Sequence, residues 1–137
     1  FCRLISKAGI TDIFAINKLC MPINFGRNHW LLGIIDMAGK SFIIYESMLQ
    51  TQRDAYSAAF DNFARIVEHE AAATLPAAAA FSTAAWERLS PGLDVPQQDG
   101  VIDCGDFTLM FAQCLSRGEA LSFSMADVPF LRRRFIL

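Results

Sequence analysis

The stretch His29-Trp30-Leu31-Leu32-Gly33-Ile34-Ile35-Asp36 is an almost uninterrupted apolar run between two segments rich in turn-forming residues. A continuous apolar run of this length is typical of a strand that is covered on both faces. Gly26-Arg27-Asn28 precedes the run and Met37-Ala38-Gly39-Lys40 follows it, so a turn bounds each end. We therefore expect residues 29–36 to form the central strand of the fold.

Two further strands are expected beside this one. Cys20–Phe25 and Ser41–Ser47 are rich in β-branched and aromatic residues and lie directly across the two turns. The four-residue turn after Asp36 predicts that Ser41–Ser47 folds back antiparallel to the central strand. Trp86–Val95 is a candidate for one more strand, which Pro91-Gly92 interrupts.

Helical periodicity predicts the remaining elements. Gln50–Ala73 is amphipathic, and Met125–Ile136 is a second amphipathic helix with Pro129 in its first turn. Asp103–Leu115 has apolar residues on most sides, which is typical of a buried helix. Phe1–Lys7 reads as the end of another helix. The expected fold class is α+β, with a small, mainly antiparallel sheet packed on the buried helix.

Bulk composition excludes several functional classes. The chain has 137 residues, 53% of them apolar, which is enough for one domain with its own core. A net charge of −2 and a pI near 5.6 argue against a nucleic-acid partner. No apolar run approaches the roughly 20 residues of a membrane span, so we expect no membrane partner.

Cysteine and histidine usage predicts neither a metal site nor a cofactor. The chain has four cysteines and two histidines, and no pair of cysteines has the C-x-x-C spacing of a zinc site. A core this apolar does not need disulfides, so we interpret all four cysteines as reduced thiols of an intracellular protein.

The second informative stretch is Gln98-Asp99-Gly100-Val101-Ile102-Asp103-Cys104-Gly105, which leads into the buried helix. Free N–H groups and the helix dipole favour a thiolate at such a position, and Gly105 leaves room for a substrate carbonyl. Taken alone, Cys104 fits better as a small buried residue at a helix start than as a nucleophile. The amide of Gln98 is a possible oxyanion donor, or simply a polar loop residue.

His29 and Glu46 are predicted to meet at one end of the sheet. They are 17 positions apart with a four-residue turn between their strands, so both fall at the open end of the hairpin. A carboxylate there can accept a hydrogen bond from the imidazole Nδ1–H and fix its tautomer. Taken singly, each is an ordinary surface residue. Together with Cys104 and Gln98, they supply the groups that a cysteine hydrolase needs.

These motifs, in this order, resemble the ubiquitin-like-protein-specific (SUMO) cysteine proteases and their adenoviral-protease relatives. The resemblance runs through MPINFGRNHWLLGIID, IIYES, VPQQDGVIDCGDF and the closing SMADVPFLRRRFIL, and it covers nearly the whole chain. It implies a papain-like cysteine protease fold of circularly related topology, with the nucleophile at the N-terminus of the buried helix.

The resemblance also assigns roles. It implies that Cys104 is the nucleophile, His29 the general base, Glu46 the group that orients the base, and Gln98 a contributor to the oxyanion hole. It implies that Trp30 packs over the C-terminal glycines of the substrate. From its own sequence context, Trp30 is an ordinary core aromatic, and both roles are compatible.

Three features depart from the family pattern. Glu46 stands where SUMO proteases usually have Asp, as in the adenoviral-type enzymes. Asp106 stands where the family usually has an apolar residue, and a carboxylate so close to Cys104 disfavours the thiolate. The family's N-terminal part is not in the sequence, so we expect residues 1–137 to be a single protease catalytic domain that lacks this part.

The resulting hypothesis is a cysteine protease or isopeptidase that cleaves after the C-terminal Gly-Gly of a SUMO-type ubiquitin-like modifier, either maturing precursors or deconjugating targets. It implies a ubiquitin-like partner, no cofactor, and a location in the nucleus or cytoplasm. Two alternatives remain open. One is a catalytically impaired module that binds ubiquitin-like proteins, and the other is an acyltransferase of the bacterial effector type.

Overall fold

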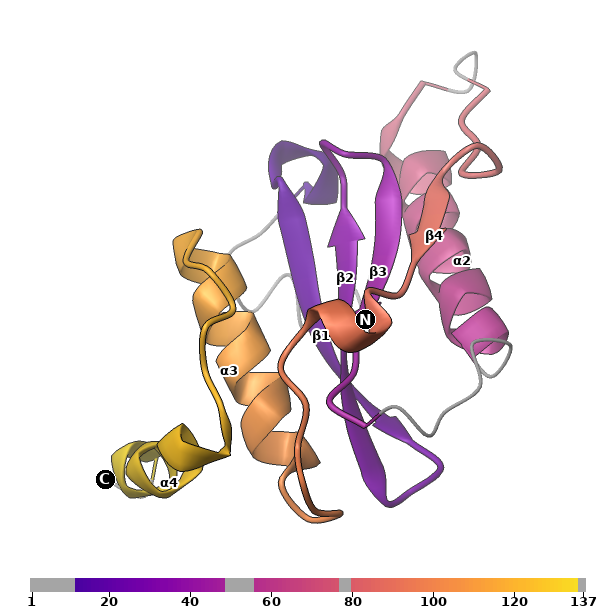
Figure 1. The fold of residues 1–137 in the computed structure, drawn as a ribbon. Helices are drawn as coiled ribbons and strands as arrows, with labels where there is room; N and C mark the ends of the chain where they lie inside the picture. The colour runs from indigo at the N-terminus through magenta and orange to yellow at the C-terminus, as the bar shows by residue number, and fades with distance from the viewer. Residues whose placement is uncertain (1–11, 49–55, 77–79, 136–137) are drawn as a thin grey trace.

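The computed structural model describes residues 12–48, 56–76 and 80–135, which form one sheet flanked by helices (Figure 1). The sheet has the strand order β1-β2-β3-β4. The strands are β1 (Lys18–Phe25), β2 (His29–Asp36), β3 (Ser41–Tyr45) and β4 (Glu87–Leu89). The α-helices are α2 (Ser57–Thr74), α3 (Cys104–Arg117) and α4 (Val128–Phe135).

The sheet confirms the predicted hairpins. β2 has the expected bounds and pairs antiparallel with both neighbours, in a register that sets Phe25 opposite His29 and Asp36 opposite Ser41. β1 begins at Lys18, earlier than expected, and β3 ends at Tyr45, before the predicted end. Of the candidate strand Trp86–Val95, only β4 forms, before Pro91-Gly92, and it pairs parallel with β3. The sheet is therefore mainly antiparallel.

The side chains of β2 alternate between two cores, as those of a strand covered on both faces must. Leu31 and Ile35 pack against α2, whereas Leu32 and Ile34 pack against α3. All four are at most 1% exposed. Figure 1 shows α2 and α3 on opposite sides of the sheet. The apolar pattern of residues 29–36 thus reflects real burial on both faces.

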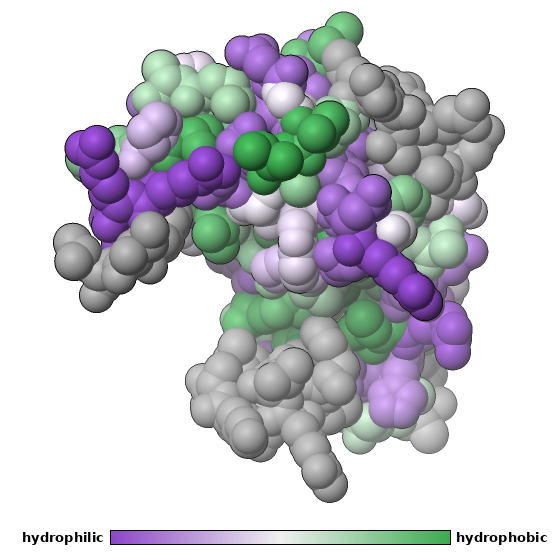
Figure 2. Space-filling view, turned by 90° about the horizontal axis from the view of Figure 1, so that it is seen from below, coloured by the Kyte–Doolittle hydropathy of each residue, from purple (hydrophilic) through white to green (hydrophobic). Residues whose placement is uncertain are grey.

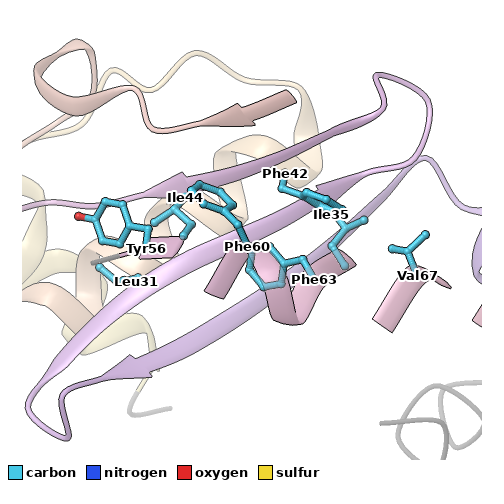
Figure 3. Close-up of a cluster of buried hydrophobic side chains, with 8 residues drawn as sticks. All are labelled: Leu31, Ile35, Phe42, Ile44, Tyr56, Phe60, Phe63 and Val67. Atoms are coloured by element: carbon cyan, nitrogen blue, oxygen red, sulfur yellow. The ribbon is translucent and has the colours of Figure 1, made fainter. Parts of the chain in front are cut away.

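The α2 core is dominated by aromatic rings (Figure 3). Its buried members come from the sheet and from α2: Leu31, Ile35, Phe42, Ile44, Tyr56, Phe60, Phe63 and Val67. Gly33 lets this core close, because a Cβ built on it would overlap the tip of the Phe63 ring. The glycine inside this strand therefore serves a close approach between sheet and helix.

The α3 core joins the sheet to the C-terminal elements. Its buried members are Leu32, Ile34, Val95, Phe107, Phe111 and Val128. The helix is buried along the side that faces the sheet, while Leu109 on its outer side is 43% exposed. The helix is therefore buried on one side only, and its apolar residue Leu109 faces solvent, because α3 forms an outer layer of the fold.

The remaining predictions concern the chain ends and long connections. The predicted helix end Phe1–Lys7 lies outside the described residues. Residues 50–55, the first part of the helix predicted over Gln50–Ala73, also lie outside them, and the described part of that helix is α2. The closing segment begins as a 3-10 turn at Met125–Asp127 with a capping box from Ser124, and continues into α4 with Pro129 in its first turn. Among the described helices, none is long and apolar enough to cross a membrane.

Candidate active site

The end of the sheet where β2 begins and β3 finishes holds the predicted histidine and carboxylate. His29 is the first residue of β2, and Glu46 directly follows β3. Nε2 of His29 lies 2.8 Å from Oε1 of Glu46, and the side chains are only 12% and 8% exposed. The predicted pairing is confirmed, and neither residue is the solvated surface group that its sequence context also allowed.

The prediction was wrong about which imidazole nitrogen contacts the carboxylate. We expected Nδ1, but Glu46 contacts Nε2, which lies at the tip of the ring and reaches the neighbouring strand. Nδ1 of His29 is buried and has no hydrogen-bond partner among the described residues. Because a carboxylate accepts the Nε2 proton, the neutral ring has its basic lone pair on Nδ1. Nδ1 is thus the atom available to take a proton.

Cys104 opens α3 and lies at the same end of the sheet. It is a free thiol and is 5% exposed. The next residue, Gly105, borders the Trp30 ring: a Cβ built on Gly105 would lie 3.8 Å from Cδ1 of Trp30. Because Trp30 directly follows His29, this approach joins the start of β2 to the first turn of α3.

Cys104 Sγ and His29 Nδ1 are not hydrogen-bonded to each other, since Nδ1 has no such partner in the described ranges. Catalytic hydrogen bonds are often long in the absence of substrate and tighten only in the complex. Trp30 is 40% exposed, so it is not the core aromatic that its sequence context also permitted. Its ring is available to a ligand beside Cys104.

Gln98 is held by Ser47, a residue that the sequence did not single out. The backbone N–H of Gln98 donates to Ser47 O at 2.9 Å, and Ser47 Oγ donates to Gln98 Oε1 at 2.7 Å. Ser47 is 1% exposed. The Ser47 hydroxyl can donate to the amide oxygen, and the other end of the amide faces a backbone carbonyl that only accepts, so the two contacts together fix the orientation of the Gln98 amide. Nε2 of Gln98 then donates to Gly100 O at 2.6 Å.

The neighbouring Gln97 anchors the same loop. Its Nε2 lies 3.0 Å from Val95 O and 3.2 Å from Glu46 O, on the backbone after β3. The loop that carries Gln98 is therefore attached to the segment that carries Glu46. No sequence signal distinguishes the roles of the two adjacent glutamines, because only the fold decides which backbone segments each side chain reaches.

Asp106, the acidic residue beside Cys104, has a cationic partner. Asp106 Oδ2 accepts from Arg132 Nε at 3.0 Å and from Nη2 at 2.8 Å. The same Nη2 donates to Asp103 Oδ1 at 2.7 Å. The hydrogen bonds and charge of Asp106, with a contribution from Asp103, raise the pKa of Arg132 above its ordinary value. Asp106 is thus neutralised by a residue of α4.

The surface around this end mixes apolar and polar side chains. Figure 2 looks at the molecule from the end at the bottom of Figure 1 and shows a compact hydrophobic group bordered by hydrophilic residues. In the loop before Cys104, Val101 and Ile102 are 71% and 76% exposed. Exposed aliphatic neighbours beside a reactive group are candidates for partner contact.

Other kinds of site find less support. A pocket of about 450 Å³ is lined by Phe14, Lys40 and Trp86 among others, and none of the predicted site residues lines it. No group of three or more His, Cys, Asp or Glu residues could hold a metal ion within the described part of the chain.

A thiol at a helix N-terminus, an imidazole oriented by a carboxylate and a locked side-chain amide together suit acyl transfer through cysteine. Comparison with known proteins agrees with this chemistry. Residues 3–137 match the sequence profile of the Ulp1 protease family, C-terminal catalytic domain. The chain belongs to the Ulp1 protease family.

Relatives within the family are identical to this chain at 28% of the aligned positions. A sentrin-specific protease of Caenorhabditis elegans is 28% identical over 125 residues, which are 91% of this chain and 17% of that protein. Ubiquitin-like-specific protease 1 of Saccharomyces cerevisiae is 28% identical over 123 residues, 90% of this chain and 18% of the relative. The chain thus spans less than a fifth of the length of these two relatives.

Solved structures of the family share the fold. The C-terminal Ulp1 protease domain in complex with Smt3, the yeast ortholog of SUMO, superposes with a TM-score of 0.77 at 26% identity, covering 96% of this chain and 55% of the other. The SUMO protease Ulp1 with its catalytic cysteine oxidised to a sulfenic acid gives a TM-score of 0.78 at 26% identity, covering 96% and 56%. These structures confirm the predicted α+β fold class.

Proposed function

We propose that the chain acts as a cysteine protease or isopeptidase that cleaves after the C-terminal Gly-Gly of a SUMO-type ubiquitin-like modifier. The observation that carries the proposal is the 2.8 Å contact between His29 Nε2 and Glu46. It leaves a buried Nδ1 with no hydrogen-bond partner among the described residues, at the end of the sheet where α3 begins with Cys104. Membership of the Ulp1 protease family supports it.

The proposed first step is attack of the Cys104 thiolate on the carbonyl carbon of the terminal glycine. His29 accepts the thiol proton on Nδ1 and Glu46 stabilises the resulting imidazolium through Nε2–H. The leaving amine then takes that proton as the carbonyl re-forms. In the second step, water deprotonated by His29 hydrolyses the thioester and frees the thiol and the modifier's carboxylate.

Two donors are proposed for the oxyanion. The Cys104 backbone N–H lies in the first turn of α3, where N–H groups have no intrahelical acceptor. Nε2 of Gln98 now donates to Gly100 O, and it has a second N–H for the oxyanion. Loss of one donor in such a site typically costs about 10²–10³-fold in kcat.

The proposed substrate preference rests on the surroundings of Cys104. Trp30 borders Gly105 and is partly exposed, which supports a role for its ring as a wall beside the scissile peptide. A wall of this kind would favour residues without side chains, such as the paired glycines of modifier tails. Val101 and Ile102 offer an exposed aliphatic surface for the folded part of the modifier. The complex of the related Ulp1 domain with Smt3 supports a SUMO-type partner.

The single-domain assignment for residues 1–137 and the location in the nucleus or cytoplasm remain part of this proposal. Ubiquitin-like conjugates occur in these compartments, and the free thiols Cys20, Cys104 and Cys114 are compatible with a reducing environment.

The decisive experiment compares Cys104→Ala with Cys114→Ala on a SUMO-type precursor and on a fluorogenic C-terminal derivative of it. Cys114 lies on the same helix, and burial raises the pKa of its thiol, which makes it a poor nucleophile. We expect Cys104→Ala to lower kcat/KM by roughly 10⁴-fold or more, and Cys114→Ala to lower it by less than about threefold. Full turnover by Cys104→Ala would overturn the assignment.

Two reagents separate the remaining alternatives. With a modifier that carries a C-terminal vinyl sulfone, we expect a covalent adduct at Cys104; binding without an adduct would instead indicate the catalytically impaired module. Incubation with acetyl-CoA tests the third possibility, because acetylation of Cys104 would indicate the acyltransferase.

A further inference from the structure

Arg132 connects the closing helix to the first turn of α3. Its Nη2 lies 2.7 Å from Asp103 Oδ1 and 2.8 Å from Asp106 Oδ2, and its Nε lies 3.0 Å from the same Asp106 oxygen. The two carboxylates are mostly buried, with side chains 8% and 17% exposed, whereas Arg132 is 46% exposed. One guanidinium thus spans two acids on another helix.

The two acids flank the proposed nucleophile. Asp103 is the N-cap residue directly before Cys104, and Asp106 lies two positions after it in the first turn of α3. Negative charges this close disfavour formation of a thiolate. They also cancel part of the positive field that the helix N-terminus supplies. A cation held against both carboxylates offsets part of this effect.

Neighbouring arginines do not share this position. Arg133 and Arg134 are exposed and make no hydrogen bond or ion pair with any described residue. The difference arises because α4 packs on the fold through Val128 and Leu131, which are 3% and 6% exposed. This packing aims the side chain of Arg132 at α3 while its neighbours point to solvent.

We propose that Arg132 is a positioning residue of the active site, which offsets the charge of Asp103 and Asp106 and thereby makes the reactivity of Cys104 depend on the docking of α4. This inference rests on the proposed function, because it takes Cys104 to be the nucleophile. Within the described part of the chain, the charged or titratable groups at this end of the sheet include Asp103 before α3, Asp106 on α3, Arg132 on α4, His29 on β2 and Glu46 after β3.

The test measures alkylation of Cys104 by iodoacetamide over a range of pH, read by mass spectrometry of its peptide. Only the thiolate reacts, so the rate at mildly acidic pH reports the thiolate fraction. We expect Arg132→Gln to lower this rate about three- to tenfold, the size of effect expected for one uncompensated charge near the protein surface. At alkaline pH the rate of this variant should approach that of the parent. Arg133→Gln is the matched control, and its profile should match that of the parent.

Two further variants keep the result interpretable if Arg132→Gln folds poorly. Asp106→Asn, with Arg132 intact, should raise the alkylation rate at mildly acidic pH above that of the parent. Arg132→Gln combined with Asp106→Asn should recover most of the parent profile, because the charge balance is restored. An unchanged profile in Asp106→Asn, or no recovery in the double variant, would contradict the inference.

The alkylation and cleavage experiments test the two proposals independently. If Arg132 controls the alkylation profile but the chain cleaves no modifier, the proposed function falls and the electrostatic effect on Cys104 stands. If cleavage occurs and depends on Cys104, but substitution of Arg132 and Asp106 leaves the pH profile of alkylation unchanged, only the inference about Arg132 is wrong.

Discussion

The hydrophobic cores on the two faces of the sheet differ in the elements that they contact. On the α2 face, eight buried residues pack together, with ring pairs such as Phe42 and Phe63 at 6.0 Å between centroids. On the α3 face, a smaller core is continuous with loops and with a helix that begins at Cys104. The predicted reactive groups therefore lie where the α3 core meets the sheet end.

Buried polar groups mark the same distinction. At the site end, Glu46, Ser47 and Asp103 are 8%, 1% and 6% exposed, and each takes part in a hydrogen bond or ion pair between separate segments. Leaving such a group without its partner costs about 1–3 kcal/mol. The α2 core is stabilised by apolar burial, whereas the site end is stabilised by specific polar contacts. Changes on the two sides should therefore have separable effects.

The largest effect on stability is expected from Phe63→Ala in the α2 core. Phe63 is 4% exposed and packs against Phe42 and Phe60. Its truncation should lower the free energy of unfolding by about 3–5 kcal/mol, measured by urea denaturation. The kcat of the molecules that remain folded should be unchanged. A loss of more than about tenfold in kcat per folded molecule would mean that the two faces are coupled.

An intermediate effect is expected from Ser47→Ala at the site end. Without the hydroxyl, Gln98 Oε1 loses its donor, and the amide keeps the Nε2 contact with Gly100 O but loses its attachment to Ser47. We expect kcat to fall about tenfold with KM little changed, and the free energy of unfolding to fall by about 1–3 kcal/mol.

Ser41→Ala is the matched control for this change. Ser41 is likewise buried, 5% exposed, but it opens β3 at the opposite end of the sheet. Its kcat should match that of the parent. An equal loss of kcat in both variants would show that Ser47 acts through stability rather than through Gln98.

The smallest effect is expected from Asp36→Asn, at the end of β2 away from the site. Burial raises the pKa of Asp36, but hydrogen bonds from the backbone of Gly39 and from Lys18, with the charge of Lys18, outweigh it and lower the pKa below its ordinary 3.8. A lowered folded-state pKa stabilises the fold above the unfolded-state pKa, and this contribution disappears as the pH falls through the folded-state value.

Asp36→Asn should therefore lower the free energy of unfolding at neutral pH by about 1 kcal/mol. It should also flatten the pH dependence of stability below about pH 4. Urea denaturation at several pH values measures both, and kcat at neutral pH should not change. A steeper loss of stability in acid than in the parent would contradict the assigned direction.

Short-range patterns were sufficient for much of the fold and for one half of the site. The bounds of β2 follow from an apolar run between two turns, and the meeting of His29 with Glu46 follows from strand geometry and turn length. The helix that starts at Cys104 follows from its periodicity. In each case the physical cause lies within a few residues of the feature, so the sequence records it directly.

Only the tertiary structure decided the rest. It determined that Nε2 of His29 rather than Nδ1 contacts Glu46, that Ser47 holds Gln98, and that Arg132 pairs with Asp106. Ser47 and Gln98 are 51 positions apart, and Asp106 and Arg132 are 26 apart, so no local pattern links them. Such contacts depend on how separate segments pack. The sequence therefore determined which chemical groups are present and at which end of the sheet, and packing determined their partners.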